Sequence, residues 1–383
     1  MRKRLSIILL ISIFMTSLVG CQGKDEVELN KYKHTFLNVF DTVVDITIYE
    51  ETKEEADVYN EYIENRFKEL HKLYDKYHTY EGVNNIKTIN DNAGIEPVKV
   101  NEELFNIISD SINWYHMYSD KTDISMGALI NVWSKYRDIH EVEGADELSI
   151  EKRLPTQEEL EIAASYTGID KIVLDSENMT VFIDNENTQI DVGAVAKGYA
   201  TELIAQEVME MGLDSGIINA GGNVRTIGVP KDGVRSKWGI AIDNPIDSET
   251  LIEWVETNGN DSTINTANEE DYTEVVYVND MSIVTSGDYQ RFFVVDGKLY
   301  HHLIDKETMY PGDNYRLVSI LTEDSGLADF LSTAVFLMAY DEGRELVDSI
   351  DGVEAIWLMK DKEKIYTDGM KDIMLSTGAT GGK

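Results

Sequence analysis

The chain has 383 residues, of which 71 are acidic and 34 basic, and its formal net charge is −37. A surface this anionic repels nucleic acid and anionic lipid head groups, so the chain is not expected to bind nucleic acid. The length is enough for two domains or for one large domain with a sizeable core. Cys21 is the only cysteine, which excludes a disulfide within the chain.

The first twenty residues have the pattern of a secretory signal. Three basic residues at positions 2–4 precede an apolar run over residues 5–19, which is too short to span a membrane comfortably. The run ends in Leu-Val-Gly-Cys21, which resembles the bacterial lipobox and implies cleavage after residue 20 with a lipid on Cys21. We therefore expect a lipoprotein anchored at the extracytoplasmic face of the cell membrane, with residues 21–34 as a polar tether.

Strands and helices are predicted to follow one another without strict alternation. The hydrophobic pattern predicts strands at 42–49, 180–184, 215–218, 274–278, 291–295 and 316–321, and helices at 54–77, 104–118, 196–211 and 326–339. Residues 140–159 form an acidic, loop-like segment with a helix start at Pro155, and residues 258–273 are expected to be a surface insertion. This mixture favours an α+β fold of mixed, mostly antiparallel sheets with packed helices.

The most informative stretch is Asp191–Ala200, Asp-Val-Gly-Ala-Val-Ala-Lys-Gly-Tyr-Ala, between a predicted strand and a predicted helix. Small residues at a helix start let backbone N–H groups approach an anion, and the helix dipole favours its charge. A diphosphate fits this description. Tight packing of a helix on a sheet explains the same glycines and alanines, so both interpretations stay open.

The predicted helix at 326–339 is apolar except for a few polar side chains. Asp329 and Thr333 are four residues apart, on one face of the helix, with Ser332 beside them. An acid in such a helix must be paired, hydrogen-bonded or bound to a cation, and oxygen ligands suit Mg²⁺ better than Zn²⁺. The alternative is a structural acid in the first helical turn together with a threonine bonded back to the backbone.

Three further motifs carry polar or small residues in turns. Ala220–Asn223 pairs two glycines after a strand, Thr285–Tyr289 combines hydroxyls with a carboxylate, and Tyr300–Asp305 places two histidines near an aspartate. A histidine and an aspartate can serve acid–base chemistry, although they can equally be surface residues. None of these motifs identifies a function alone.

Together the motifs resemble, in order, those of the ApbE family of bacterial flavin transferases. The similar blocks are 122–133, 191–200, 220–223, 284–289, 301–311 and 328–333, with looser similarity at 40–43 and 77–80. The resemblance covers nearly all of the chain after the tether. It implies an ApbE-like, T-fold-like domain at 35–371 that transfers FMN from FAD to a threonine or serine hydroxyl of another protein and releases AMP.

The resemblance also implies which residues form the site. Mg²⁺ or Mn²⁺ would be held by the backbone carbonyl of Ala194 and by Asp329 and Thr333, with Ser332 adjacent. FAD would contact Phe40, Tyr80, Gly127, Ala128, Leu129, Asp191, Lys197 and Leu303. The catalytic residues would be His302 or Asp305 as the base and Lys197 as the cation that neutralises phosphoryl charge.

Some positions depart from the family pattern. Phe40-Asp41-Thr42 stands where the family usually has Met-Gly-Thr, and Lys306-Glu307 replaces the usual Pro-Lys or Pro-Arg. Residues 372–383 are expected to form a flexible tail. Within this tail, Leu375–Thr380 resembles the Ser/Thr-Gly-Ala-Thr core of the acceptor sequences that the family modifies, which raises the hypothesis that Thr380 is itself modified.

The expected partners are secreted or membrane redox proteins that carry such an acceptor motif. Two alternative functions use the same site: an FAD diphosphatase with water as acceptor, and an FAD-binding lipoprotein without activity. A solute-binding lipoprotein would share the lipobox but would not need Asp329 and Thr333.

Overall fold

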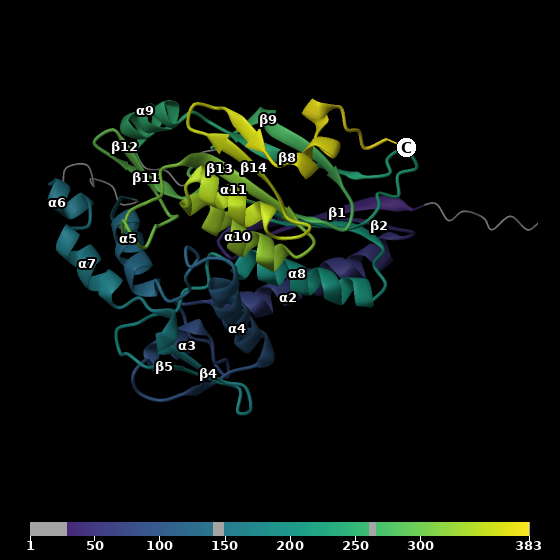
Figure 1. Ribbon diagram of the computed structural model, residues 1–383. Coiled ribbons are helices and arrows are strands. Elements are labelled where there is room, and N and C mark those ends of the chain that lie inside the picture. The colour runs from purple at the N-terminus through teal and green to yellow at the C-terminus, as the bar shows by residue number, and fades with distance from the viewer. Residues whose placement is uncertain (1–28, 141–148, 260–265, 383) are drawn as a thin grey trace, which may run out of the picture.

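The computed structural model describes residues 29–140, 149–259 and 266–382. At its centre is an eight-stranded antiparallel sheet in the order β1-β2-β6-β7-β10-β13-β14-β15 (Figure 1). Its strands are β1 (Asn30–Val39), β2 (Thr42–Glu50), β6 (Ser215–Ala220), β7 (Asn223–Gly228), β10 (Ser282–Gly287), β13 (Tyr315–Thr322), β14 (Glu354–Met359) and β15 (Lys364–Tyr366).

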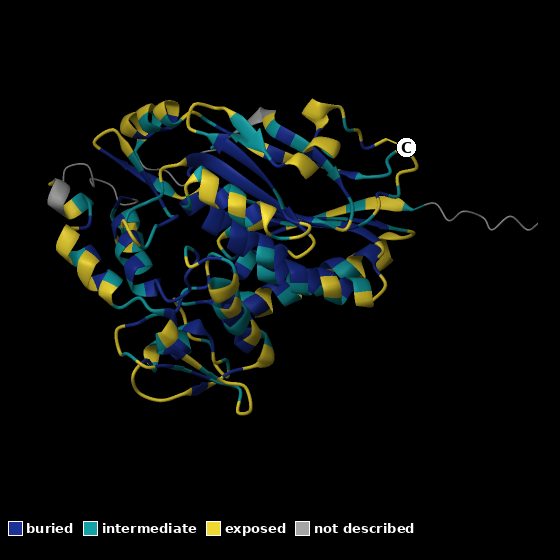
Figure 2. Cartoon of the chain, in the orientation of Figure 1, coloured by how far each residue is buried: buried dark blue, intermediate teal, exposed yellow. Residues whose placement is uncertain are grey.

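Helices cover one face of this sheet. They are α2 (Lys53–Tyr74), α4 (Glu102–Met117), α8 (Ala196–Glu210), α10 (Ser325–Leu337) and α11 (Tyr340–Asp348). Figure 2 shows α10 almost wholly buried between the sheet and its neighbouring helices, and Leu327 is its only residue that is not buried. The side chains of α10 therefore contact either the protein core or the candidate site.

The opposite face of the sheet is covered by the hairpin of β8 (Trp238–Pro245) and β9 (Ala267–Val278) and by α9 (Ser248–Asn258). Successive residues of a strand point to opposite faces, and β14 follows this rule. Ala355 and Trp357 belong to the core on the helical side, whereas Ile356 and Leu358 pack with Trp238 on the other side. The sheet is thus buried on both faces.

Two smaller units lie beside the sheet (Figure 1). One contains α3 (Ile86–Asp91), η2 (Ile169–Lys171) and a three-stranded sheet of β3 (Val98–Lys99), β5 (Thr180–Ile183) and β4 (Ile172–Asp175). The other contains α5 (Gly127–His140), α6 (Ile150–Arg153), α7 (Gln157–Ser165) and the hairpin of β11 (Phe292–Val295) and β12 (Lys298–His301). A third hydrophobic cluster, around Trp133, holds this second unit together.

The predicted α+β class and mostly antiparallel pairing are confirmed. Within the described residues, no helix is both long and apolar enough to cross a membrane. Cys21 and the proposed signal lie outside the described residues. Several predicted boundaries need correction: the helix predicted at 54–77 ends at Tyr74, α6 and α7 occupy part of the acidic segment, and β9 takes up residues 267–273 of the expected insertion.

Both ends of the predicted domain also differ from expectation. β1 begins at Asn30, inside the expected tether, because its residues pair with β2 from Asn30 opposite Glu50 onward. The C-terminal segment, expected to be a flexible tail, is bound to the β8–β9 hairpin. It contains η4 (Leu375–Thr377), which follows η3 (Asp368–Asp372); Met374 is fully buried, and Ser376 Oγ donates to Glu274 Oε2 at 2.5 Å.

Candidate functional site

The first turn of α8 meets the N-terminal half of α10 at Gly198 and Asp329. The backbone N–H of Gly198 donates to Asp329 Oδ2 at 2.8 Å, and Asp329 is only 4% exposed. A Cβ at position 198 would overlap the Ser325 carbonyl oxygen and the Asp329 side chain, so only glycine permits this approach. Asp329 therefore caps an N–H at the positive end of α8.

Oxygen atoms gather around this contact. The Ala194 carbonyl lies one helical turn before Gly198, and within the described residues no N–H donates to it. Thr333 and Ser332 lie one turn after Asp329, and Ser286 Oγ of β10 is 2.8 Å from Ser332 Oγ and 3.5 Å from Thr333 Oγ1. The structure thus brings the four predicted metal residues to the junction of two helices.

The donor set suits a hard cation. It offers one carboxylate, a backbone carbonyl and hydroxyls, the oxygen ligands that Mg²⁺ and Mn²⁺ accept. Among the described residues there is no group of three or more His, Cys, Asp or Glu side chains that could hold a metal. A cation here would therefore depend on backbone and hydroxyl oxygens, and on oxygens of a bound phosphate, as Mg²⁺ commonly does.

Asp191 precedes α8 and is paired within the protein. Its Oδ2 is 2.6 Å from Lys76 Nζ, and its Oδ1 accepts the backbone N–H of Gly193 at 2.8 Å. The loop before α8 is also held by Gly127, whose N–H donates to the Gln189 carbonyl at 2.9 Å. The predicted FAD residues Gly127 and Asp191 therefore lie beside each other.

Tyr80 and Phe40 come from other elements and are each fixed by hydrogen bonds. The hydroxyl of Tyr80 donates to Asp75 at 2.7 Å, and burial together with this bond raises the pKa of Tyr80 to about 12. Phe40 and Asp41 form the β1–β2 turn with φ of 50° and 52°, a left-handed backbone that is costly for these residues. The Phe40 ring packs against Phe67, His71 and Tyr74.

Arg291 connects this turn to the rest of the site. Its Nη2 donates to the Phe40 carbonyl at 3.1 Å, which helps to hold the left-handed turn. Its positive charge also lowers the pKa of both Asp191 and His302. Arg291 therefore acts on three of the predicted site residues, on Phe40 through a hydrogen bond and on Asp191 and His302 through its charge.

The two adjacent histidines have different environments. His301 is buried, its Nε2 donates to the Gly312 carbonyl at 2.6 Å, and burial lowers its pKa to about 4. His302 is half-buried, and its Nδ1 has no hydrogen-bond partner. Burial, followed by the positive charge of Arg291, holds the pKa of His302 well below its usual value, so the ring is a neutral base at pH 7. Lys197 and Arg137 add to this positive field.

Asp305, the other predicted base, is occupied by structural contacts. Its Oδ1 accepts the backbone N–H of Glu307 at 2.8 Å, and its Oδ2 lies 3.4 Å from Lys121 Nζ. Lys306 Nζ lies 2.9 Å from Asp120 Oδ2, so the loop that contains Asp120 and Lys121 is joined to the loop that contains Asp305 and Lys306 by ion pairs in both directions. This geometry favours His302 over Asp305 as the base.

Three predicted FAD contacts, Gly127, Leu129 and Leu303, are limited by burial. The Leu129 side chain is fully buried in the cluster around Trp133, and Leu303 is 6% exposed in the main core. Ala128, between Gly127 and Leu129, is partly exposed. A ligand at the start of α5 would therefore meet Ala128 rather than the buried Gly127 or the Leu129 side chain.

The remaining motifs have structural roles. Gly221 and Gly222 form the β6–β7 turn with φ of 57° and 89°, and Gly221 lies so close to Thr42 that a Cβ would overlap its side chain. Asp288 is 1% exposed and is bound by Arg316 at 3.0 Å. The first motif supports the Phe40 turn, and the second stabilises the sheet.

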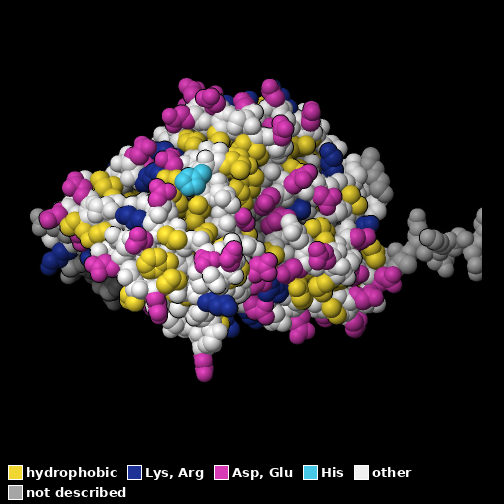
Figure 3. All heavy atoms as spheres, turned by 60° about the horizontal axis from the view of Figure 1, so that its bottom comes forward, with side chains coloured by type: hydrophobic (Ala, Val, Ile, Leu, Met, Phe, Trp, Pro, Cys, Tyr) yellow, Lys and Arg dark blue, Asp and Glu magenta, His cyan; other side chains and the backbone are white. Residues whose placement is uncertain are grey.

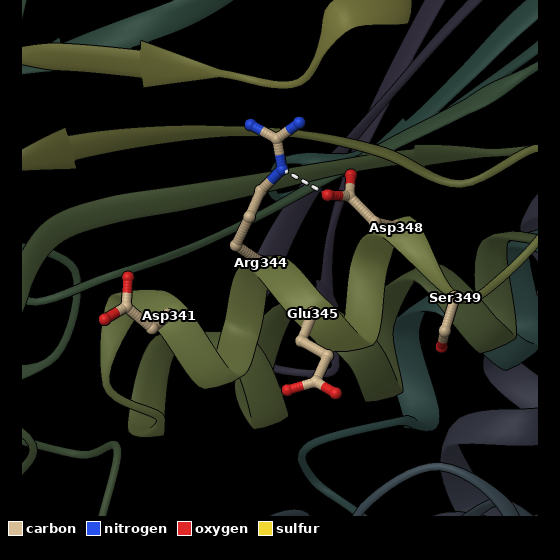
Figure 4. Close-up of a pocket in the computed structure, with 5 residues that line it drawn as sticks. All are labelled: Asp341, Arg344, Glu345, Asp348 and Ser349. Carbon is tan, nitrogen blue, oxygen red and sulfur yellow. Dashed lines mark hydrogen bonds and ion pairs between the residues drawn. The ribbon is translucent and has the colours of Figure 1, made fainter.

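Two hollows lie outside this site. One is on α11 and is lined by Asp341, Arg344, Glu345, Asp348 and Ser349, with Arg344 Nε 2.7 Å from Asp348 Oδ2 (Figure 4). All five residues belong to α11 or to its C-terminal end. This is the composition of a helix surface whose charged side chains are solvated. The other lies behind His301, between α9 and β12, and includes Lys298 and Tyr310.

Acidic side chains dominate the charged surface, as Figure 3 shows for one face, where hydrophobic side chains gather near the middle. In this setting, the three cations that lower the pKa of His302, namely Arg291, Lys197 and Arg137, are unusual.

Asp75, Lys76 and Arg291 were not predicted from the sequence, because each acts through a partner that is distant in the chain or through a local turn. Only the cationic character of Arg291 in an acidic chain offered a signal.

The fold and the site define an α+β protein in which a glycine-rich helix start meets oxygen donors of a second helix. A model of the ApbE family matches residues 40–357, and the chain belongs to this family. The FAD:protein FMN transferase of Treponema pallidum is 28% identical over 294 residues, which cover 75% of this chain and 74% of that protein.

Two further relatives show similarity to the same family. The FAD:protein FMN transferase of Vibrio cholerae is 26% identical over 282 residues, 73% of this chain and 74% of the relative. The crystal structure of the ApbE protein of Thermotoga maritima has a TM-score of 0.70 and 26% identity, and the match covers 89% of this chain and 98% of that one. This chain therefore shares its fold with nearly the whole of the Thermotoga maritima structure.

Proposed function

We propose that this chain is an FAD:protein FMN transferase that moves FMN from FAD to a threonine or serine hydroxyl and releases AMP. The observation that carries this proposal is the junction of α8 and α10, where the Gly198–Asp329 bond lies among oxygen donors at a helix start. Lys197, one residue before Gly198, adds a cation at the same helix end. Membership of the family and the names of its relatives support the same activity.

A divalent cation would be held by Ala194, Asp329 and Thr333, with Ser332 adjacent. When bound, Mg²⁺ or Mn²⁺ would supply charge neutralisation on the phosphoryl oxygens. Lys197 and the N-terminus of α8 would bind the diphosphate of FAD. Phe40, Tyr80 and Ala128 would line the flavin and adenosine portions, and Asp191 would lie beside the diphosphate.

The reaction forms one bond and breaks one. The acceptor hydroxyl oxygen attacks the phosphorus of the FMN half, and the bond from this phosphorus to the bridging oxygen breaks, so AMP leaves with that oxygen. His302 would take the hydroxyl proton, because its ring is neutral, its buried Nδ1 has no partner in the described residues, and it lies in a positive field that favours phosphate oxygens nearby.

The partners would be secreted or membrane redox proteins with a Ser/Thr-Gly-Ala-Thr motif. A lipid on Cys21 would hold the enzyme at the extracytoplasmic face of the cell membrane, where it would meet them. Globomycin treatment of cells, which blocks lipoprotein signal cleavage, tests this anchor: the uncleaved precursor should accumulate. An unchanged size and release of the protein into the medium would contradict it.

Thr380 as an acceptor is a separate proposal. Its segment is fixed by Gly381, whose carbonyl accepts the N–H of Ser236 at 2.8 Å, so reaching the site would require release of this segment or a second molecule. Thr380 itself is exposed. Mass spectrometry of protein incubated with FAD and Mg²⁺ decides the matter, and an unmodified C-terminal peptide would end the proposal.

The experiment that tests the function measures AMP release from FAD with and without an acceptor peptide. Transfer predicts AMP only when both peptide and Mg²⁺ are present. Equal AMP release without peptide would indicate the diphosphatase, and bound FAD with no AMP would indicate a binding protein.

A further inference from the structure

Lys76 lies in a buried polar network beside the candidate site. It follows Asp75, where α2 ends, and its Nζ is 2.6 Å from Asp191 Oδ2 and 2.7 Å from Asn131 Oδ1. The side chains of Lys76 and Asp191 are 9% and 10% exposed. This ion pair is one of the least exposed in the described part of the chain.

The network joins three segments that are distant in the sequence. Asn131, in the second turn of α5, binds Lys76 through its oxygen and donates its amide to Gln189 Oε1. Asp191 binds Lys76 and, through its other oxygen, the N–H of Gly193. The end of α2, the start of α5 and the loop before α8 are therefore fixed relative to one another by Lys76.

The charge of this pair matters for a phosphate ligand. Burial alone would raise the pKa of Asp191, but the nearby Lys76 ammonium, then the Gly193 N–H and then Arg291 hold it below its usual value, so the carboxylate is charged. Without Lys76, this negative charge would face a bound diphosphate in a chain that already carries a net charge of −37. With Lys76, the pair is neutral and its geometry is fixed.

We infer that Lys76 is a positioning residue for FAD, which neutralises Asp191 and holds the loop up to Gly193 in the shape that admits the diphosphate. This inference rests on the proposed function, because it takes FAD as the ligand. Lys76 does not itself touch the reacting atoms, and no transfer step depends on it directly.

The test is a double-mutant cycle on the affinity for FAD, measured by flavin fluorescence with Mg²⁺ and without acceptor. Lys76→Met should weaken FAD binding by about 30-fold or more, because it leaves an unpaired buried carboxylate beside the diphosphate. In an Asp191→Asn background, the same change should cost less than about threefold. Riboflavin, which carries no phosphate, should lose less than about threefold with Lys76→Met.

Lys68→Met is the matched control, because it removes the same charge from an exposed position on α2. Thermal melts show which variants fold; if Lys76→Met does not, Lys76→Gln, which also removes the charge, takes its place in both backgrounds. An equal loss of FAD affinity in both backgrounds, or an equal loss for riboflavin, would overturn the inference. If the wild type binds no FAD, the proposed function fails instead.

Discussion

The backbone N–H of Gly198 donates to Asp329 across 131 residues of sequence, at 2.8 Å. This single bond puts the carboxylate of α10 at the N-terminus of α8, where the helix dipole favours negative charge. It also leaves the Ala194 carbonyl without its usual helical donor, since Gly198 is four residues further on. The proposed cation site depends on this arrangement.

Removing the Asp329 carboxylate should abolish transfer. Asp329→Ala is expected to lower the rate of flavin transfer by about 100-fold or more, because the only carboxylate of the oxygen set is lost. It also leaves the Gly198 N–H unpaired, which should cost about 1–3 kcal/mol of unfolding free energy. A flavin gel and a urea melt measure the two effects. Asp348→Ala, on the exposed side of α11, is the control, and near-normal transfer by Asp329→Ala would contradict the account.

Adding one methyl group at Gly198 should separate the two helices. Gly198→Ala places a Cβ against the Ser325 carbonyl and Asp329, so we expect a loss of about 1–3 kcal/mol of stability together with a loss of transfer. Gly343→Ala in α11 is the matched control, because its Cβ would meet no atom closer than Val335 Cγ1, at 3.1 Å, and the Val335 carbonyl oxygen and Met338 Cβ lie at ordinary contact distances. Equal urea midpoints for the two variants would show that α8 and α10 are not in close contact.

Replacing the proposed base, His302, should lower the transfer rate without weakening FAD binding. His302→Gln is expected to reduce the transfer rate by about 100-fold, since general base catalysis contributes about that much, while FAD affinity without acceptor changes less than about threefold. Because the pKa of His302 is depressed, kcat/KM should not fall as pH drops from 8 to 6.5. A steep loss of kcat/KM over that range would mean that His302 is not the neutral base described here.

Folding stability should depend on pH through His301. Its pKa is lowered from 6.5 to about 4 by burial, so the folded state binds the proton more weakly than the unfolded chain. Its contribution is fully present above pH 6.5 and is lost as pH falls towards 4, by about 1.4 kcal/mol per pH unit. His301→Gln should flatten this slope in urea melts at pH 7 and 5, whereas His116→Gln, an exposed control, should not.

The sequence alone predicted the helices α2, α4, α8 and α10 and the two segments that build the site, but it missed α5, α9 and α11. Asp191–Ala200 and Asp329–Thr333 stood out because small and polar residues interrupt apolar patterns, and the local pattern is enough to place the first at a helix start and the second within a helix. The pairing of β2 with β6 could not be predicted, because the partners are separated by between 168 residues, for Ile48 and Gly216, and 176 residues, for Val44 and Ala220. Sheet order is set by tertiary packing rather than by any local signal.

The roles of individual polar residues needed the structure. His301 and His302 are indistinguishable in sequence, yet one donates to Gly312 inside the core and the other has a free nitrogen in the site. Lys76 looks like an ordinary surface lysine after a helix, because its partner lies 115 residues away. The tail looked flexible because its residues are small, but Glu274 and the β8–β9 hairpin hold it.

The central claim is tested most directly by incubating the protein with FAD, Mg²⁺ and a peptide that contains Ser-Gly-Ala-Thr, followed by mass spectrometry of the peptide. The account predicts a peptide that carries one FMN on the threonine, formed only when the cation is present and not by Asp329→Ala. An unmodified peptide in the presence of FAD-saturated wild-type protein would contradict it.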